Sequence, residues 1–307
     1  DNADQQRSPG LLVICGPTAS GKSSLALQLS SRLNSPILSA DSRQVYRRFD
    51  IGTAKASLQE RQLVPHYLID ICEPTDVFTL AEYQRLSQPI VAQHHQHSIT
   101  PILVGGTGLY IRSIVRGLKI PRVAPQPLLR AQLAQLGQPQ CYEMLQQVDP
   151  QSARGIHPND KVRTLRSLEV LYGTGIPMSC QQGECPPSYP ILQIGLDSGD
   201  LTQRIRQRTH QMVDAGLVDE VTGICATYGT ELPLLNTLGY AEVMAHLNGT
   251  ANIEETVQHI VGHTRQFAKR QRTWFHGDKT IEWFDADQPD LLDRVWQRVS
   301  QFLTRSG

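Results

Sequence analysis

The chain has 307 residues and carries 29 Lys and Arg against 29 Asp and Glu, so its formal net charge is zero. That balance excludes a protein that binds nucleic acid through its overall charge, although it leaves room for a local basic groove. Apolar residues make up 39% of the chain and charged residues 19%, which excludes a disordered protein. The length indicates two domains, or one domain with a large insertion.

Apolar runs, such as Leu11–Cys15, reach about five residues, whereas a membrane span needs about 20. Residues 1–10 are polar and lack the apolar segment of a signal peptide. We therefore expect a soluble protein with no membrane partner, located in the cytoplasm, or in an organelle after removal of a transit peptide.

Six cysteines, at positions 15, 72, 141, 180, 185 and 225, form no C-x-x-C pair. We interpret them as reduced thiols rather than as zinc ligands or a disulfide framework. His94, His95 and His97 lie close together in a polar segment, which favours a solvated helix end over a metal site.

The first elements along the chain are predicted to be a strand, a loop and a helix. Leu11–Cys15 is apolar, and leucines four residues apart predict a helix over 23–33. Residues 36–38, 67–71 and 101–104 are interpreted as further short buried strands, separated by polar or helical segments. This alternation predicts an α/β fold, with a parallel sheet flanked by helices.

The pattern changes after Gly117, where several prolines precede a helical stretch at 128–172 and a Gly-, Pro- and Ser-rich loop at 173–190. A strand at 191–196 resumes the α/β pattern, and helices dominate from residue 202 onward. We therefore predict a core formed by residues 1–118 and 186–307, with a helical insertion domain at 119–185.

Residues 16–23 match G-x-x-x-x-G-K-[ST], the signature of a phosphate-binding loop, or P-loop. Glycines let backbone N–H groups surround an anion, and the following helix N-terminus adds a partial positive charge. Lys22 supplies a charge for a terminal phosphate, and the Ser23 hydroxyl is a candidate Mg²⁺ ligand. The candidate phosphate-binding residues are Gly16, Pro17, Thr18, Ala19, Ser20, Gly21, Lys22 and Ser23.

A phosphate loop alone indicates a di- or triphosphate and leaves several functions open. The sequence lacks the N/T-K-x-D element of a GTPase, but a nucleotide or small-molecule kinase and a switch ATPase remain alternatives. An RNA-binding protein without chemistry is a further alternative. Asp70, at the end of a predicted strand, is interpreted equally well as a Mg²⁺-holding acid or as a strand-end cap.

Further motifs follow the phosphate loop in one order along the chain. They are Ser39–Tyr46, Asp50–Lys55, Pro65–Asp70, Leu103–Tyr110, Ile156–Asp160 and Arg265–Gln271. Together with the loop they resemble the tRNA dimethylallyltransferase (tRNA isopentenyltransferase) family, over residues 11 to 276. The chain ends at Gly307 without the zinc-finger extension of the eukaryotic branch, so we expect the bacterial type.

The resemblance implies an enzyme that transfers a dimethylallyl group from dimethylallyl diphosphate to the N6 amine of the adenine 3′ of the anticodon, releasing diphosphate. It implies that the loop binds the donor's diphosphate, with Mg²⁺ as cofactor, rather than ATP. It also implies that Arg208 contacts the diphosphate. Arg204 and Arg208 are four residues apart and share a helix face.

An aromatic amine is a poor nucleophile, and a neighbouring carboxylate can accept its proton as the new bond forms. Asp41 is the candidate base, and its alternative interpretation is a helix cap. Thr107 matches a family position that contacts the reacting region, and it too could be a helix cap. Asp41 and Thr107 are therefore the predicted catalytic residues.

The resemblance also implies a tRNA partner, with the insertion held over the anticodon stem-loop, and we expect a monomer. The implied tRNA-binding residues are Asp41, Ser42, Arg43, Gln44, Thr107, Arg130, Val162, Arg163, Thr164, Leu165, Arg166, Asn236, Thr237, Leu238, Gly239, Tyr240 and Ala241.

Independently of the resemblance, residues 256–277 contain no Asp or Glu. Arg265, Lys269 and Arg272 fall on one stripe of a helix there, interleaved with Phe267, Trp274 and Phe275. This pattern suits RNA phosphates and stacked bases. The alternative is a solvated helix with Phe267 and Trp274 in the core.

Overall fold

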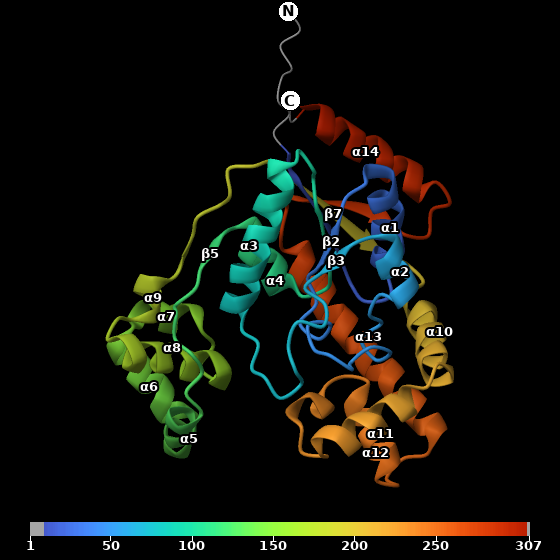
Figure 1. Cartoon of the computed structure of the whole chain (residues 1–307). Coiled ribbons are helices and arrows are strands. Elements are labelled where there is room, and N and C mark those ends of the chain that lie inside the picture. The colour runs from blue at the N-terminus through green and yellow to red at the C-terminus, as the bar shows by residue number, and fades with distance from the viewer. Residues whose placement is uncertain (1–8, 306–307) are drawn as a thin grey trace, which may run out of the picture. The chain divides into compact units, whose positions relative to one another are not determined.

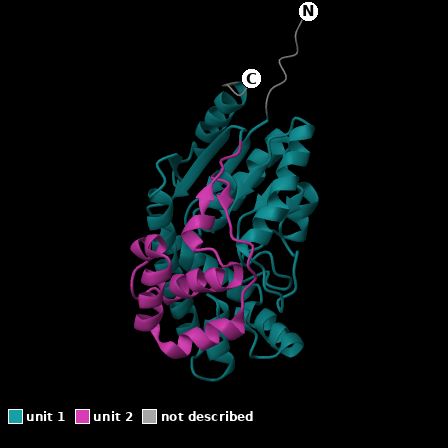
Figure 2. Ribbon diagram, turned by 90° about the vertical axis from the view of Figure 1, so that its left-hand side faces the viewer, with its two compact units in different colours: residues 1–115, 188–307 teal, residues 116–187 magenta. Residues whose placement is uncertain are grey.

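The computed structural model describes residues 9–305. The chain divides into two compact units (Figure 2), one formed by Asp1–Val115 with Ser188–Gly307 and the other by Arg116–Pro187. The second unit corresponds to the helical insertion expected at 119–185.

Unit 1 is built on a six-stranded parallel sheet in the order β3-β2-β4-β1-β7-β8. Figure 1 labels β2, β3 and β7 of this sheet together with several of the surrounding helices. The prediction of a parallel α/β sheet is confirmed. The strands are β1 (Leu11–Cys15), β2 (Ile37–Ser39), β3 (His66–Tyr67), β4 (Ile102–Val104), β7 (Ile191–Asp197) and β8 (Ile281–Asp285). β1 lies in the interior of the sheet, where it pairs with β4 on one side and β7 on the other.

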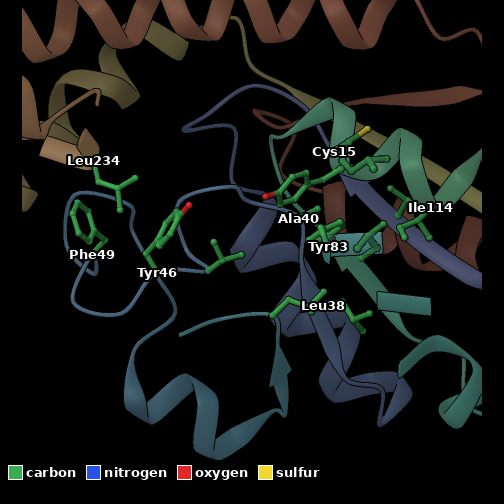
Figure 3. Packing of buried hydrophobic residues seen from close by; sticks show 14 of the residues in the cluster. Cys15, Leu38, Ala40, Tyr46, Phe49, Tyr83, Ile114 and Leu234 are labelled. Atoms are coloured by element: carbon green, nitrogen blue, oxygen red, sulfur yellow. The ribbon is translucent and has the colours of Figure 1, made fainter. Parts of the chain in front are cut away.

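Helices cover both faces of this sheet, as the side chains of β1 show. Leu11, Val13 and Cys15 belong to one buried cluster, and Leu12 and Ile14 belong to another. Because successive strand residues point to opposite faces, each face has its own core. Figure 3 shows part of the first cluster, including Leu38, Tyr83 and Ile114.

The helices of unit 1 are named in chain order. They are α1 (Lys22–Leu33), α2 (Leu58–Leu63), α3 (Leu80–Gln96), α4 (Gly108–Val115), α10 (Leu201–Asp214), α11 (Leu217–Tyr228), the 3₁₀ helix η1 (Pro233–Asn236), α12 (Tyr240–Leu247), α13 (Ile253–His276) and α14 (Leu291–Arg305).

Unit 2 is a helical bundle closed by a short antiparallel ribbon in which Leu118 pairs with Glu184. Its core contains Leu133, Leu145 and Leu168. Its elements are β5 (Leu118–Lys119), α5 (Pro127–Leu136), α6 (Gln138–Val148), α7 (Pro150–Gly155), α8 (Lys161–Thr174), α9 (Met178–Gln181) and β6 (Gly183–Glu184).

Three local expectations differ from the structure. β8 interrupts the predicted helical C-terminal region. The strand expected at 67–71 ends at Tyr67, because Leu68 and Asp70 have left-handed φ angles of 65° and 55° that break the extended backbone. The predicted loop at 173–190 contains α9 and β6. Within residues 9–305, no helix combines the length and apolar character needed to cross a membrane.

The structure also shows the state of the cysteines and the surroundings of the histidine cluster. All six cysteines are free. The histidine cluster lies at the end of α3 and is not simply solvated, because His95 Nε2 contacts the carbonyl of Gly10 at 2.9 Å.

Candidate active site

The strands are parallel, so their carboxyl ends lie on one side of the sheet, and ligands of open α/β sheets bind beyond these ends. Three loops leave the sheet at these ends. β1 continues into the phosphate loop at 16–21, β2 into the turn that starts at Asp41, and β4 into the turn at 105–107. Since β4 lies between β1 and β2, all three loops meet there.

The phosphate loop has the backbone that its glycines predict. Gly16 has φ +132°, and a Cβ there would lie 2.2 Å from the carbonyl oxygen of Leu196, so the loop passes where a side chain cannot fit. Gly21, with φ +92°, precedes the first turn of α1. The Lys22 ammonium bends back onto this loop and donates to the Pro17 carbonyl and, at 3.4 Å, to the Ser20 hydroxyl.

Lys22 and Arg208 place two desolvated cations at the loop. Burial, with a smaller contribution from the neighbouring Arg208 guanidinium, lowers the pKa of Lys22 to about 8. Burial also lowers the pKa of Arg208, whose Nη1 lies 3.5 Å from Thr18 Oγ1. An anion bound between them would relieve both penalties. Arg204, on the same helix, instead pairs with Asp287 at 2.8 Å.

Asp41 is held by its own turn. Its Oδ1 accepts the N–H groups of Arg43 at 2.8 Å and Gln44 at 3.3 Å. Within the described part of the chain, its Oδ2 makes no hydrogen bond. Asp41 therefore caps a turn rather than a helix, and one carboxylate oxygen stays available at the cavity that the residue lines.

Thr107 connects the two turns. Its Oγ1 accepts the Ser42 N–H at 3.0 Å, and its own N–H donates to the Ala40 carbonyl at 3.1 Å. The hydroxyl thus binds the turn after β2 rather than capping α4. A Cβ at Gly105 would lie 2.1 Å from the Ala40 carbonyl oxygen, so the two turns are in direct backbone contact.

These groups line one cavity of about 560 Å³, formed entirely by unit 1. Of the predicted site residues, the cavity brings together Thr18, Ala19, Lys22, Ser23, Asp41, Ser42, Arg43, Gln44, Thr107, Arg208, Asn236, Thr237, Leu238, Gly239 and Tyr240. The remaining loop residues, Gly16, Pro17, Ser20 and Gly21, complete the turn between β1 and α1. Ala241 follows in the first turn of α12 and is partly exposed.

Tyr240 and Glu220 fix one wall of this cavity. Tyr240 is 1% exposed, and its hydroxyl donates to Glu220 Oε1 at 2.7 Å. The same carboxylate accepts the N–H groups of Asp50, Ile51 and Gly52 at 2.7 to 3.2 Å. Glu220 therefore holds the loop after β2 against the start of α12.

The basic stripe on α13 is only partly available. Arg265 and Lys269 are exposed, but Arg272 forms a bidentate pair with Asp197 at 2.7 to 3.0 Å, so counting it among free cations was wrong. The side chains of the aromatic residues divide in the same way. Phe267 is 37% and Trp274 42% exposed, whereas Phe275 is buried, which overturns the alternative with Phe267 and Trp274 in the core.

In unit 2 the predicted tRNA-binding residues also differ in how exposed their side chains are. Val162 is 76% exposed, and the Arg163 side chain is 62% exposed. Thr164 and Leu165 are buried, the latter in the core of the unit, so their side chains offer no surface for RNA.

Arg130 and Arg166 are engaged by Glu169, which has no exposed surface. Arg130 binds it through two nitrogens at 2.7 and 2.8 Å, and Arg166 through one at 2.6 Å. Although burial opposes ionisation, these arginines and the N–H of Gln126 lower the pKa of Glu169 to about 2.

The interpretation of Asp70 as a Mg²⁺-holding acid is wrong. Asp70 binds Lys55 and Arg61 at 2.6 Å each, and it follows β3 at the edge of the sheet, separated from β1 by β2 and β4. Both carboxylate oxygens are therefore used in a structural ion-pair cluster.

Two residues of the site were not singled out from the sequence. Gln271 contacts the phosphate loop from α13. The sequence could have indicated it, because Gln271 lies three residues after Ala268 and four before Phe275, and this spacing places a polar residue on the buried face of the helix. Glu220 offered no such signal, since its partners at 50–52 are about 170 residues away.

Comparisons with known proteins find one matching family and several similar proteins. Residues 44–278 match the family described as IPP transferase. The chain is similar to the tRNA dimethylallyltransferase of Acaryochloris marina, with 61% identity over 295 residues, covering 95% of this chain and 98% of that protein. A solved tRNA isopentenylpyrophosphate transferase from Bacillus halodurans gives a TM-score of 0.72 at 33% identity, covering 97% of both chains. A eukaryotic dimethylallyltransferase acting on tRNA gives a TM-score of 0.82 at 26% identity, covering 97% of this chain and 80% of that one.

Proposed function

Because the chain belongs to the IPP transferase family, we propose that it is a tRNA dimethylallyltransferase. The reaction moves the dimethylallyl group of dimethylallyl diphosphate onto the N6 amine of the adenine 3′ of the anticodon. The observation that carries this proposal is the cavity in which the phosphate loop, Arg208, Asp41 and Thr107 meet.

The donor's diphosphate fits the loop end of the cavity. Lys22 and Arg208 supply two positive charges in a partly desolvated setting, where each electrostatic contact is stronger than in water. As the bond between the prenyl carbon and the diphosphate oxygen breaks, negative charge grows on that oxygen. Cations fixed in advance at this position stabilise the transition state more than the ground state.

Asp41 is the proposed base for the acceptor amine. The N6 nitrogen forms a bond to the terminal prenyl carbon, the carbon–oxygen bond breaks, and diphosphate leaves with the electron pair. The nitrogen then carries one proton too many, which the free Oδ2 of Asp41 can accept. Because Oδ1 is fixed by two backbone N–H groups, the carboxylate is oriented before the substrate arrives.

The same site suits Mg²⁺. The Ser23 hydroxyl, on the first turn of α1, lines the cavity, and Mg²⁺ is commonly held by one or two protein oxygens together with phosphate oxygens. Bound there, the ion would add charge stabilisation for the leaving diphosphate. Lys22, Arg208 and the loop amides would still bind and orient the donor.

The acceptor is proposed to lie over the cavity wall formed by Asn236–Tyr240 and the exposed α13 side chains. Arg270 places its guanidinium 5.8 Å from the centre of the Phe267 ring, and both residues line the cavity. An unpaired adenine can stack on such a surface, since every base has a π face. In unit 2, the exposed Arg163 is the proposed phosphate contact. We further propose that the enzyme works as a monomer in the cytoplasm.

The test uses labelled dimethylallyl diphosphate, unmodified tRNA and Mg²⁺, with the product analysed for N6-prenylated adenosine. Transfer to tRNA, without tRNA-stimulated ATP hydrolysis, supports the proposal. ATP turnover with a small acceptor would favour the kinase alternative, and tRNA binding without transfer would favour an RNA-binding protein. Free adenine nucleotides serve as the control acceptor, because prenylation of these in preference to tRNA would change the substrate class.

A further inference from the structure

Gln271 is a polar residue on the buried face of α13. It is 6% exposed, and its neighbours on that face, Ala268 and Phe275, are each 2% exposed. Burying a carboxamide costs free energy unless its donor and its acceptor are both hydrogen-bonded. The hydrogen-bond partners of the Gln271 carboxamide therefore determine what this buried group does in the structure.

Both ends of the carboxamide bind backbone groups of the active site. Oε1 accepts the N–H of Thr18 at 2.8 Å, and Nε2 donates to the carbonyl of Gly106 at 3.0 Å. Thr18 belongs to the phosphate loop, and Gly106 directly precedes Thr107. One planar group thus joins the two loops that leave β1 and β4.

The fit around this group is close. A Cβ at Gly106 would lie 2.3 Å from Nε2 of Gln271, so a side chain at position 106 would displace the amide from its present position. Thr107 is in turn bonded to Ser42, the neighbour of Asp41. Three hydrogen bonds and the Gly106–Thr107 peptide therefore connect the phosphate loop through Gln271 to the Asp41 turn.

We propose that Gln271 is a positioning residue for prenyl transfer, which fixes the phosphate loop relative to the Thr107 turn. The proposal rests on the proposed function, and it assigns to Gln271, which also lines the cavity, a role through the two loops that it joins. Fixed spacing between donor and acceptor matters because a misplacement of about 1 Å can cost a reaction about 100-fold.

Two variants of Gln271 test this role. Gln271→Met keeps the length of the side chain and removes both hydrogen bonds. Gln271→Glu keeps the shape and the acceptor, and a protonated Glu regains an O–H donor toward the Gly106 carbonyl. Gln258, which is exposed on the same helix, is changed to Met and Glu as a matched control. Single-turnover transfer is measured at saturating donor and tRNA, together with binding of each substrate and thermal unfolding.

We expect Gln271→Met to lower the saturated rate by about 10- to 100-fold, while tRNA affinity stays within about threefold. For Gln271→Glu, the rate relative to wild type should rise at least about fivefold as pH falls, because protonation restores the missing donor. Lys22, Arg208 and Arg270, which line the same cavity, favour the ionised form, so the pH series extends from 8 to about 5.5. Dividing the rate of Gln271→Glu by the wild-type rate at each pH removes the pH dependence that the wild-type reaction itself has.

The proposal is overturned if Gln271→Met transfers within about twofold of wild type. A loss in Gln271→Glu that does not change with pH, or a loss that follows unfolding alone, would also overturn it. If wild-type protein transfers nothing, the proposed function fails instead. The role of Gln271 is then tested by calorimetry with inorganic diphosphate. Gln271→Met should weaken the affinity for diphosphate at least about threefold, whereas Gln258→Met should leave it unchanged. An unchanged affinity in Gln271→Met would reject the positioning role.

Discussion

The hydroxyl of Thr107 accepts a hydrogen bond from the backbone N–H of Ser42 at 3.0 Å. This single contact joins the turn after β4 to the turn after β2 and fixes the residue next to Asp41. The two proposed catalytic residues therefore cannot move independently, which is the preorganised geometry that proton transfer to a fixed base requires.

Replacing Asp41 with Asn should lower the single-turnover rate of transfer by about 10²- to 10⁴-fold, the range for loss of a general base. The Asn oxygen can still accept the N–H groups of Arg43 and Gln44, so the unfolding temperature and donor affinity should hardly change. Asp76→Asn is the control. Asp76 also caps a turn, because it accepts the Glu73 N–H, and it lies 35 residues after Asp41 in the chain. A loss below tenfold in Asp41→Asn would leave Asp41 as a turn cap.

Diphosphate binding should take up protons above pH 8. Burial lowers the pKa of Lys22 to about 8, so at pH 8.5 most of the free protein carries a neutral amine at this position. A bound anion favours the ammonium and raises that pKa, so part of a proton enters with each diphosphate. Calorimetry in buffers of different ionisation enthalpy measures this uptake. It should shrink at pH 7 and disappear in Lys22→Met, whereas uptake that persists in the variant would point to another group.

The arginines of α8 should respond differently to alanine substitution. Arg163 is exposed, and its pair with Asp160 at 3.4 Å is a surface contact that contributes at most about 1 kcal/mol to stability. Arg163→Ala should reduce the salt dependence of tRNA binding by about 0.7 to 0.9 in log–log slope with little loss of stability. Arg166 binds Glu169 and the Val123 carbonyl, and Arg166→Ala should lower the free energy of unfolding by about 1–3 kcal/mol. Salt titrations and denaturant unfolding of both variants test this, and equal slope changes with no stability loss would contradict it.

Gly105→Ala should destabilise the fold by about 1–3 kcal/mol, because the new methyl group would overlap the Ala40 carbonyl and push the two turns apart. Gly223→Ala is the matched control. Gly223 lies within α11 with open space around it, so the same substitution should stabilise by about 0.5–1 kcal/mol. Denaturant unfolding of both variants measures the difference, and a stable Gly105→Ala would show that the backbone contact is loose.

The elements around the phosphate loop could be predicted from the sequence because their signals are local. An apolar run, a glycine-rich loop and leucines at helical spacing define β1, the loop and α1 within a few residues. β8 gave a weaker signal, since Ile281–Asp285 contains charged Glu282 and Asp285 and begins shortly after a long helix that ends at His276. The early end of β3 depends on left-handed residues, which apolar patterning does not reveal.

Which basic residues are engaged by the fold could not be predicted, because it depends on contacts between segments that are distant in sequence. Arg272 and Lys269 look equivalent on a helix projection, yet Arg272 is paired with Asp197, 75 residues earlier. Arg163 and Arg166 each have an acidic partner three residues away, Asp160 and Glu169. Only the second acid is buried, and Glu169 also binds Arg130, 39 residues earlier. Pairings of this kind are set by the tertiary fold, and they decide which basic residues remain for RNA.

The position of β1 in the sheet also affects how the protein is made. β7 covers one edge of β1, and it is synthesised roughly 180 residues later, so at about 5–20 residues per second that edge stays unpaired for roughly 10–35 s. A wholly apolar strand with an open backbone edge is prone to intermolecular pairing. The yield of folded protein should therefore depend on translation speed and chaperone supply during this interval, and slowing synthesis between β1 and β7 should increase aggregation.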